Sequence, residues 1–154
     1  ALAFIVSILI SQFEETIARD ALLAALMPVV ALVGGNSGAQ SLAIVIRALA
    51  RNDVSDARTF EVIGKQSLIG LVNGLLIGTM SFLLLSITGL STYALALSIA
   101  VFGNILIGNL FGASIPLILK KLKFDPALAS NIFLTLITDI IGFAGFLGIA
   151  LILI

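Results

Sequence analysis

Residues 134–147 read LTLITDIIGFAGFL, a run of apolar side chains with one carboxylate, Asp139, near its middle. No lysine or arginine occurs anywhere in residues 127–154 to neutralise it. A charge at the centre of a bilayer costs about 2.5–3.5 kcal/mol on insertion scales, and intramembrane acids are therefore functional candidates by default. If this stretch crosses a membrane, Asp139 is the first residue to which a function should be assigned.

The composition of the whole chain supports a membrane environment. Of its 154 residues 60% are hydrophobic and only 10% are charged, with a mean hydropathy of +1.27, whereas soluble domains carry about 25% charged residues. We therefore predict an all-α polytopic membrane protein that forms a single domain over residues 1–154. The chain has no cysteine or histidine, which excludes thiolate and imidazole metal sites and leaves hard cations that prefer oxygen ligands.

Five apolar segments are separated by polar turns. They cover residues 1–13, 21–50, about 67–90, 92–119 and 127–154. A transmembrane helix needs about 20 apolar residues, so the last four segments are long enough to span a bilayer. The first segment is too short, and we expect it to be the end of a longer helix whose beginning is missing from this chain.

The basic residues predict the orientation in the membrane. Seven of the eight lie in or next to the loops that follow the second and fourth segments, namely Arg47, Arg51, Arg58, Lys65, Lys120, Lys121 and Lys123. By the positive-inside rule these loops are cytoplasmic. The N-terminus is then expected in the cytoplasm, the C-terminus outside it, and the protein in the cell (inner) membrane. The outer loops are predicted at residues 14–20 and 89–93.

The last segment has a clear helix start, because Asp125 is a good N-cap residue and Pro126 suits the first helical position. Asp139 lies 14 residues beyond the cap, or about 21 Å along the helix axis. Asn131, Thr135 and Asp139 follow one another at intervals of four, so they form one stripe on the helix. This stripe is either an ion pathway or polar contact between helices, and the partner of Asp139 is either a cation or a proton.

The second segment contains GGNSGAQ at residues 34–40. Asn36 and Gln40 are four residues apart, so their amide oxygens share a helix face and are candidates for lining a pore. Gly34 and Gly38 form a Gly-xxx-Gly pattern that is typical of close helix packing. Both interpretations can hold for the same helix.

Further small and polar residues occur in the other segments. Three asparagines are additional candidates for lining a pathway: Asn73, Asn104 and Asn109. Five glycines are expected to serve helix packing alone: Gly74, Gly78, Gly103, Gly108 and Gly112.

The charge of a divalent ion, compared with the acids that each chain supplies, predicts how many copies of the chain form the site. A divalent cation favours two nearby negative charges, and the chain supplies one acid at membrane depth. A twofold homodimer would bring two Asp139 carboxylates to one axis and would form a pore between the protomers. With so few ligands the ion keeps much of its water, which suits Mg²⁺ because this ion dehydrates reluctantly.

These motifs resemble the transmembrane domain of the MgtE magnesium channel family, which includes the eukaryotic SLC41-type carriers. The resemblance rests on three stretches: FEETIAR at 13–19, PVVALVGGNSGAQSLA at 28–43, and KFDPALASNIFLTLITDIIG at 123–142. It implies a homodimer with five transmembrane helices per protomer and a central pore. It also implies that hydrated Mg²⁺ is bound by Asp139, with Asn131 and Thr135 on the same helix and Gly35 and Asn36 lining the pore.

The chain departs from the family pattern in two ways. Family members usually carry upstream cytosolic regulatory domains, an acidic N-terminal domain and a CBS pair, which are absent from this chain. Either they belong to a longer parent protein, which the short first segment favours, or this member lacks them. The outer loop carries two neighbouring acids, Glu14 and Glu15, which either concentrate cations at the outer mouth or are solvated surface residues.

The leading functional hypothesis is a channel that conducts hydrated Mg²⁺ down its electrochemical gradient through paired Asp139 carboxylates. The alternative is a carrier or exporter of the same family, coupled to Na⁺ or H⁺. A third hypothesis is a structural membrane anchor in which Asp139 only joins helices. The sequence does not separate Mg²⁺ from Mn²⁺, Co²⁺ or Ca²⁺. We expect no enzymatic activity and no nucleic-acid partner, because the residues for either are lacking.

Overall fold

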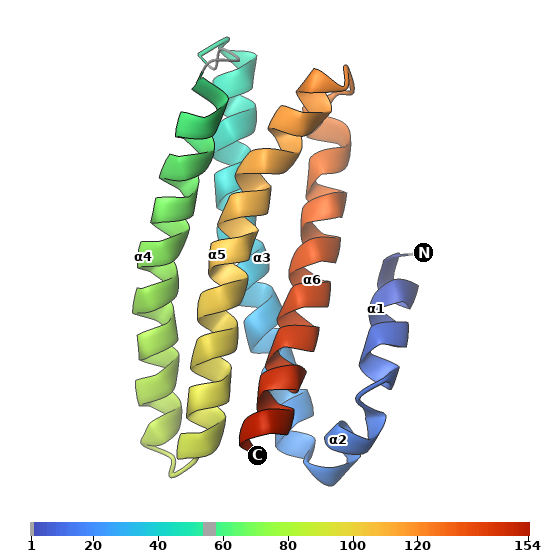
Figure 1. The fold of residues 1–154 in the computed structure, drawn as a ribbon, viewed down its shortest axis with the longest axis vertical. Helices are drawn as coiled ribbons and strands as arrows, with labels where there is room; N and C mark the ends of the chain where they lie inside the picture. Colours follow the sequence, from blue (N-terminus) through green and yellow to red (C-terminus); the bar gives the residue numbers. More distant parts are fainter. Residues whose placement is uncertain (1, 54–57) are drawn as a thin grey trace.

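The computed structural model describes residues 2–53 and 58–154, and in this part of the chain all regular structure is helical (Figure 1). The helices are α1 (Leu2–Ser11), α2 (Glu14–Arg19), α3 (Ala21–Ala50), α4 (Thr59–Ser86), α5 (Ser91–Lys121) and α6 (Pro126–Leu153). Four of them, α3 to α6, contain stretches long and apolar enough to cross a membrane. The four predicted spans are thereby confirmed.

The helix α5 is the centre of the fold. It packs against α3, α4 and α6, while α4 packs mainly against α5 and lies at the edge of the bundle. The chain runs up through α3, down through α4, up through α5 and down through α6, so α3 and α5 are parallel (Figure 1). The short helix α1 stands beside α6, outside the four-helix bundle, and contacts it.

Helix ends follow local chemistry. The Asp20 carboxylate accepts a hydrogen bond from the Leu22 backbone N–H at 2.9 Å and so caps α3, while its other oxygen accepts from the Tyr93 hydroxyl. Asp125 caps α6 in the same way, accepting from the Ala127 N–H at 2.8 Å with Pro126 at the first helical position. The predicted start of the last segment is therefore confirmed.

Two boundaries differ from the prediction. The helix α4 begins at Thr59, well before the apolar stretch at 67, because Val62 and Ile63 pack against a buried cluster of α3 and α5. The exposed ion pair of Glu61 and Lys65, at 2.7 Å, adds a small stabilisation. The outer connection predicted as a loop at residues 14–20 contains the six-residue helix α2.

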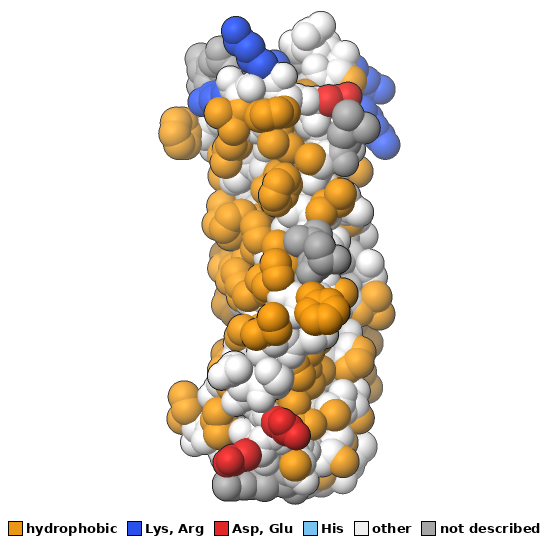
Figure 2. All heavy atoms as spheres, turned by 90° about the vertical axis from the view of Figure 1, so that its right-hand side faces the viewer, with side chains coloured by type: hydrophobic (Ala, Val, Ile, Leu, Met, Phe, Trp, Pro, Cys, Tyr) orange, Lys and Arg blue, Asp and Glu red, His pale blue; other side chains and the backbone are white. Residues whose placement is uncertain are grey.

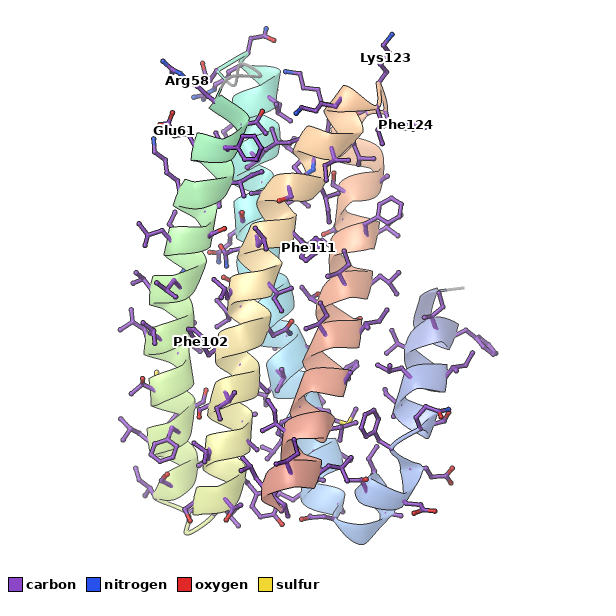
Figure 3. The ribbon with its side chains drawn as sticks, viewed as in Figure 1. Arg58, Glu61, Phe102, Phe111, Lys123 and Phe124 are labelled. Carbon is purple, nitrogen blue, oxygen red and sulfur yellow. The ribbon has the colours of Figure 1, made fainter. Side chains whose placement is uncertain are left out.

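The surface is divided along the long axis of the molecule. Hydrophobic side chains cover the middle, and in the same view the basic side chains gather at one end (Figure 2). Arg58 and Lys123, from two different loops, lie at this end (Figure 3). An apolar belt with a basic end is what a membrane-embedded bundle requires.

The interface between α3 and α5 depends on glycine, as predicted. A Cβ atom on Gly38 would lie 2.8 Å from the carbonyl oxygen of Gly108, and one on Gly108 would lie 2.5 Å from the carbonyl oxygen of Gly34. Gly112 is equally close to Gly38. Gly103, in contrast, faces open space, so the prediction that it serves packing was wrong.

Candidate functional site

A groove between α1 and α6 holds the predicted stripe. Its volume is about 530 Å³, and it is lined on the α6 side by Asn131, Ile132, Thr135, Leu136 and Asp139. Ala3, Val6 and Ser7 of α1 line the facing wall. The structure therefore brings the amide, hydroxyl and carboxylate of the stripe together on one open surface, as their four-residue spacing predicted.

Asp139 lies halfway along α6, a helix of 28 residues, and so at the depth of a bilayer centre. The carboxylate is partly buried. Within residues 2–53 and 58–154 it takes part in no hydrogen bond or ion pair. A carboxylate at this depth without a protein partner requires water, a proton or a cation.

Asn131 and Thr135 are exposed in the isolated chain although both lie in a span. Polar groups exposed at membrane depth are costly when they face hydrocarbon, so this face requires water or another protein surface. The three oxygen-bearing side chains do not surround an ion by themselves. In the described part of the chain there is no group of three or more acidic, histidine or cysteine residues able to hold a metal.

Thr138, the residue before Asp139, packs this part of α6 against the bundle. Thr138 is fully buried, and its hydroxyl donates to the backbone carbonyls of Leu134 at 3.0 Å and Thr135 at 3.1 Å. A Cβ on Gly35 of α3 would lie 3.7 Å from this hydroxyl. Gly35 is therefore close to α6 at Thr138, at a distance that would also admit a methyl group.

The other predicted pore residues of α3 are not part of this groove. Asn36 and Gln40 are exposed on α3, and neither is among the described residues that line the groove. Both lie near the middle of a 30-residue span, so they present further polar groups at membrane depth. Their assignment as pore-lining residues remains a prediction.

Two asparagines suggested as lining residues belong to the core instead. Asn104 and Asn109 of α5 are only 1% and 2% exposed. The Asn109 amide donates to the Ser37 hydroxyl at 2.6 Å and to the Ile105 carbonyl at 2.9 Å. The prediction failed for them because a single helix sequence does not tell which of its faces the neighbouring helices cover.

The predicted acids of the outer mouth lie on the helix α2. Glu14 lines a second hollow of about 420 Å³ together with Ser7, Ser11 and Ile17. Ser7 lines both this hollow and the Asp139 groove, so the two are adjacent. Glu15 is exposed but does not line either hollow among the described residues.

Ser7 was missed by the sequence analysis. Its hydroxyl donates to the Ala3 carbonyl at 2.9 Å, within its own helix. Ser7 and Ser11 are four residues apart in α1 and so share one helical face, and this spacing is the signal that would have indicated Ser7.

The fold and the groove define a multi-pass α-helical membrane protein with an oxygen-lined groove at membrane depth. The family model described as "MgtE: Divalent cation transporter" matches residues 27–149. The chain belongs to the MgtE family, as its motifs predicted.

Three relatives share the name "Magnesium transporter MgtE". The protein of Bacillus subtilis is 34% identical over 146 residues, which cover 92% of this chain. That of Enterococcus faecalis is 33% identical over 92% of the chain. That of Thermus thermophilus is 34% identical over 95% of the chain. The chain spans 32% of the length of each relative.

Proposed function

We propose that this chain is the ion-conducting part of a Mg²⁺ transporter and that Asp139 binds the ion. The observation that carries the proposal is the carboxylate of Asp139, halfway along a spanning helix, without a protein partner in the described chain, and in one groove with Thr135 and Asn131. Family membership supports it, because the relatives are named magnesium transporters.

The ligands favour a hydrated ion. One carboxylate, one hydroxyl and one amide give a hard cation only three ligand side chains, and the groove of about 530 Å³ has room for water. Mg²⁺ keeps several waters and binds proteins through one or two carboxylates. An ion that keeps its water molecules is held by side-chain oxygens outside that water shell. Such a site does not need a dense cluster of acids. The same chemistry admits Mn²⁺, Co²⁺ and Ca²⁺ as competing ions.

A homodimer completes the site. Two copies of the chain with their polar faces opposed would place two Asp139 carboxylates at one axis, which balances the charge of a divalent ion. The exposed polar groups Asn36, Gln40, Asn131 and Thr135 would then line a water-filled pore instead of facing lipid. Light scattering of the purified protein in detergent and in nanodiscs tests this arrangement, and a strictly monomeric protein contradicts it.

The membrane potential supplies the driving force. A divalent cation gains about 4.6 kcal/mol per 100 mV on entering a negative interior, twice the value for one charge. The basic end of the bundle is assigned to the cytoplasm by the positive-inside rule, so ions enter from the α2 end and pass Asp139 on the way to the basic end. No phosphate-binding G-x-x-x-x-G-K sequence occurs in the chain.

Uptake into liposomes tests the function and separates it from coupled transport. A channel carries Mg²⁺ into vesicles that contain the protein, at a rate set by the membrane potential and unaffected by a Na⁺ or H⁺ gradient at fixed potential. The alternative carrier of the same family exchanges Mg²⁺ for Na⁺ or H⁺, and uptake then follows that gradient. Absence of uptake above that of empty vesicles contradicts both.

A further inference from the structure

Asn104 joins three helices at the middle of the bundle. It lies halfway along α5, is 1% exposed, and donates its side-chain N–H to the Val30 carbonyl oxygen of α3 at 2.9 Å. Its amide oxygen Oδ1 is buried without a hydrogen-bond partner in the described part of the chain. An unpaired amide oxygen is destabilising in a membrane interior, so packing stability alone does not account for asparagine at this position.

Two glycines make room for the Asn104 amide. A Cβ on Gly142 of α6 would lie 2.6 Å from Nδ2 of Asn104 and 3.5 Å from the Val30 side chain. A Cβ on Gly34 of α3 would overlap the same amide group. The amide therefore fills the point where α3, α5 and α6 meet, and it touches α6 directly at Gly142.

Gly142 and Asp139 belong to the same turn of α6. Three residues separate them, which corresponds to about 4.5 Å along the axis and about 60° around it. Gly142, which contacts Asn104, lies four residues beyond Thr138, which faces Gly35, so both residues are on one side of α6. A contact at Gly142 is therefore close enough to Asp139 to affect the direction of its side chain.

We infer that Asn104 is a positioning residue for Asp139: by filling the junction with Gly34 and Gly142 it sets the rotation of α6 that directs the Asp139 side chain into the groove beside α1. The inference rests on the proposed function, which assigns ion binding to Asp139. Asn104 is buried and is not among the described residues that line the Asp139 groove.

Asn109 is a matched control on the same helix. It is also a buried asparagine, and its amide donates a hydrogen bond to Ser37 of α3. A Cβ on Gly70 of α4 would lie 2.7 Å from the Cβ of Asn109. In the described part of the chain its side chain bonds to α3 and to its own helix and packs beside Gly70 of α4. Loss of either asparagine removes buried hydrogen bonds, but only Asn104 acts on the helix of Asp139.

Chemical labelling provides a test that is independent of transport. The chain has no cysteine, so Asp139→Cys introduces a single thiol whose reaction with a water-soluble methanethiosulfonate reagent reports access to the groove. The full chain is reconstituted in bilayers with Asp139→Cys alone, or combined with Asn104→Ala or Asn109→Ala.

We expect Asn104→Ala to lower the labelling rate at position 139 by about fivefold or more, and Asn109→Ala to change it by less than about twofold. An unchanged rate with Asn104→Ala overturns the inference, as does an equal decrease in both backgrounds. A thiol at position 139 that does not react in the parent background also overturns it, because the groove would then be closed to water.

A second pair of variants covers the case in which Asn104→Ala does not fold. Gly142→Ala pushes on the same amide from α6, whereas Gly145→Ala, one turn further along, meets open space. We expect the thiol at position 139 to label more slowly in the Gly142→Ala variant and at the parent rate in the Gly145→Ala variant. Equal labelling rates in these two variants contradict the inference. If labelling follows this pattern while the chain that keeps Asp139 carries no Mg²⁺, the proposed function is refuted and the positioning role remains intact.

Discussion

Gly108 of α5 lies so close to Gly34 of α3 that a Cβ atom on Gly108 would stand 2.5 Å from the Gly34 carbonyl oxygen. Backbone, and not a flexible side chain, occupies the space, so the two helices have to move apart to admit a methyl group. Because α5 contacts all the other spanning helices, this contact affects the whole bundle.

The substitution Gly108→Ala is therefore expected to destabilise the protein by about 1–3 kcal/mol, the usual cost of overpacking a core. Thermal unfolding in detergent measures the effect as a lower midpoint. Gly103→Ala on the same helix meets nothing within 4 Å and serves as the control. Equal midpoints for the two variants contradict the packing described for α3 and α5.

The hydroxyl of Thr135 supplies one of the three oxygen ligands proposed for the ion. Replacing it in Thr135→Val keeps the shape of the side chain and removes about 0.5–1.5 kcal/mol of hydrogen bonding. The Mg²⁺ concentration for half-maximal uptake should rise by about two- to tenfold, as measured by uptake at a series of concentrations.

The matched control for this change is Thr79→Val, on the exposed face of α4 in a different groove. It should leave the half-maximal concentration unchanged. If Thr135→Val behaves like Thr79→Val, the hydroxyl of Thr135 does not contact the ion or its water.

Glu14 is expected to attract cations to the outer end of the groove. It lines a hollow that shares Ser7 with the Asp139 groove. At about 0.01 M ionic strength, where the Debye length is about 30 Å, Glu14→Gln should slow uptake by about twofold. At about 1 M ionic strength, where the Debye length is about 3 Å, the difference should vanish.

Glu61→Gln is the control for this electrostatic effect, because Glu61 is also an exposed acid but lies at the opposite, basic end of the bundle (Figure 3). It should not slow uptake from the α2 end at either ionic strength. A decrease with Glu14→Gln that persists at high salt would identify a structural role for Glu14 instead.

Much of the fold could be predicted because the membrane imposes simple rules on the sequence. The span at 21–50 agrees with the helix α3, since Asp20 caps it and apolar residues fill its length. The helix α4 starts earlier than predicted because Val62 and Ile63, in its first turns, pack against buried residues of α3 and α5. Hydropathy marks the part of a helix that lies in the membrane and does not mark where the helix ends.

The candidate site could be predicted in part. The stripe on α6 follows from the spacing of Asn131, Thr135 and Asp139 within one helix, and the structure places all three in one groove. The facing wall of the groove, which includes Ser7, depends on how α1 packs beside α6. The packing of one helix against another cannot be predicted from the spacing of residues within a single helix. Asn104 was misjudged for the same reason, because its burial depends on glycines of α3 and α6.

Magnesium uptake by Asp139→Ala is the most direct test of the central claim, that the Asp139 carboxylate binds the conducted ion. Parent, Asp139→Ala and Glu61→Ala are reconstituted in equal amounts into liposomes held at one membrane potential. The account predicts Mg²⁺ uptake by the parent and by Glu61→Ala, and uptake by Asp139→Ala no faster than in empty vesicles. Equal uptake by the parent and by folded Asp139→Ala would contradict it.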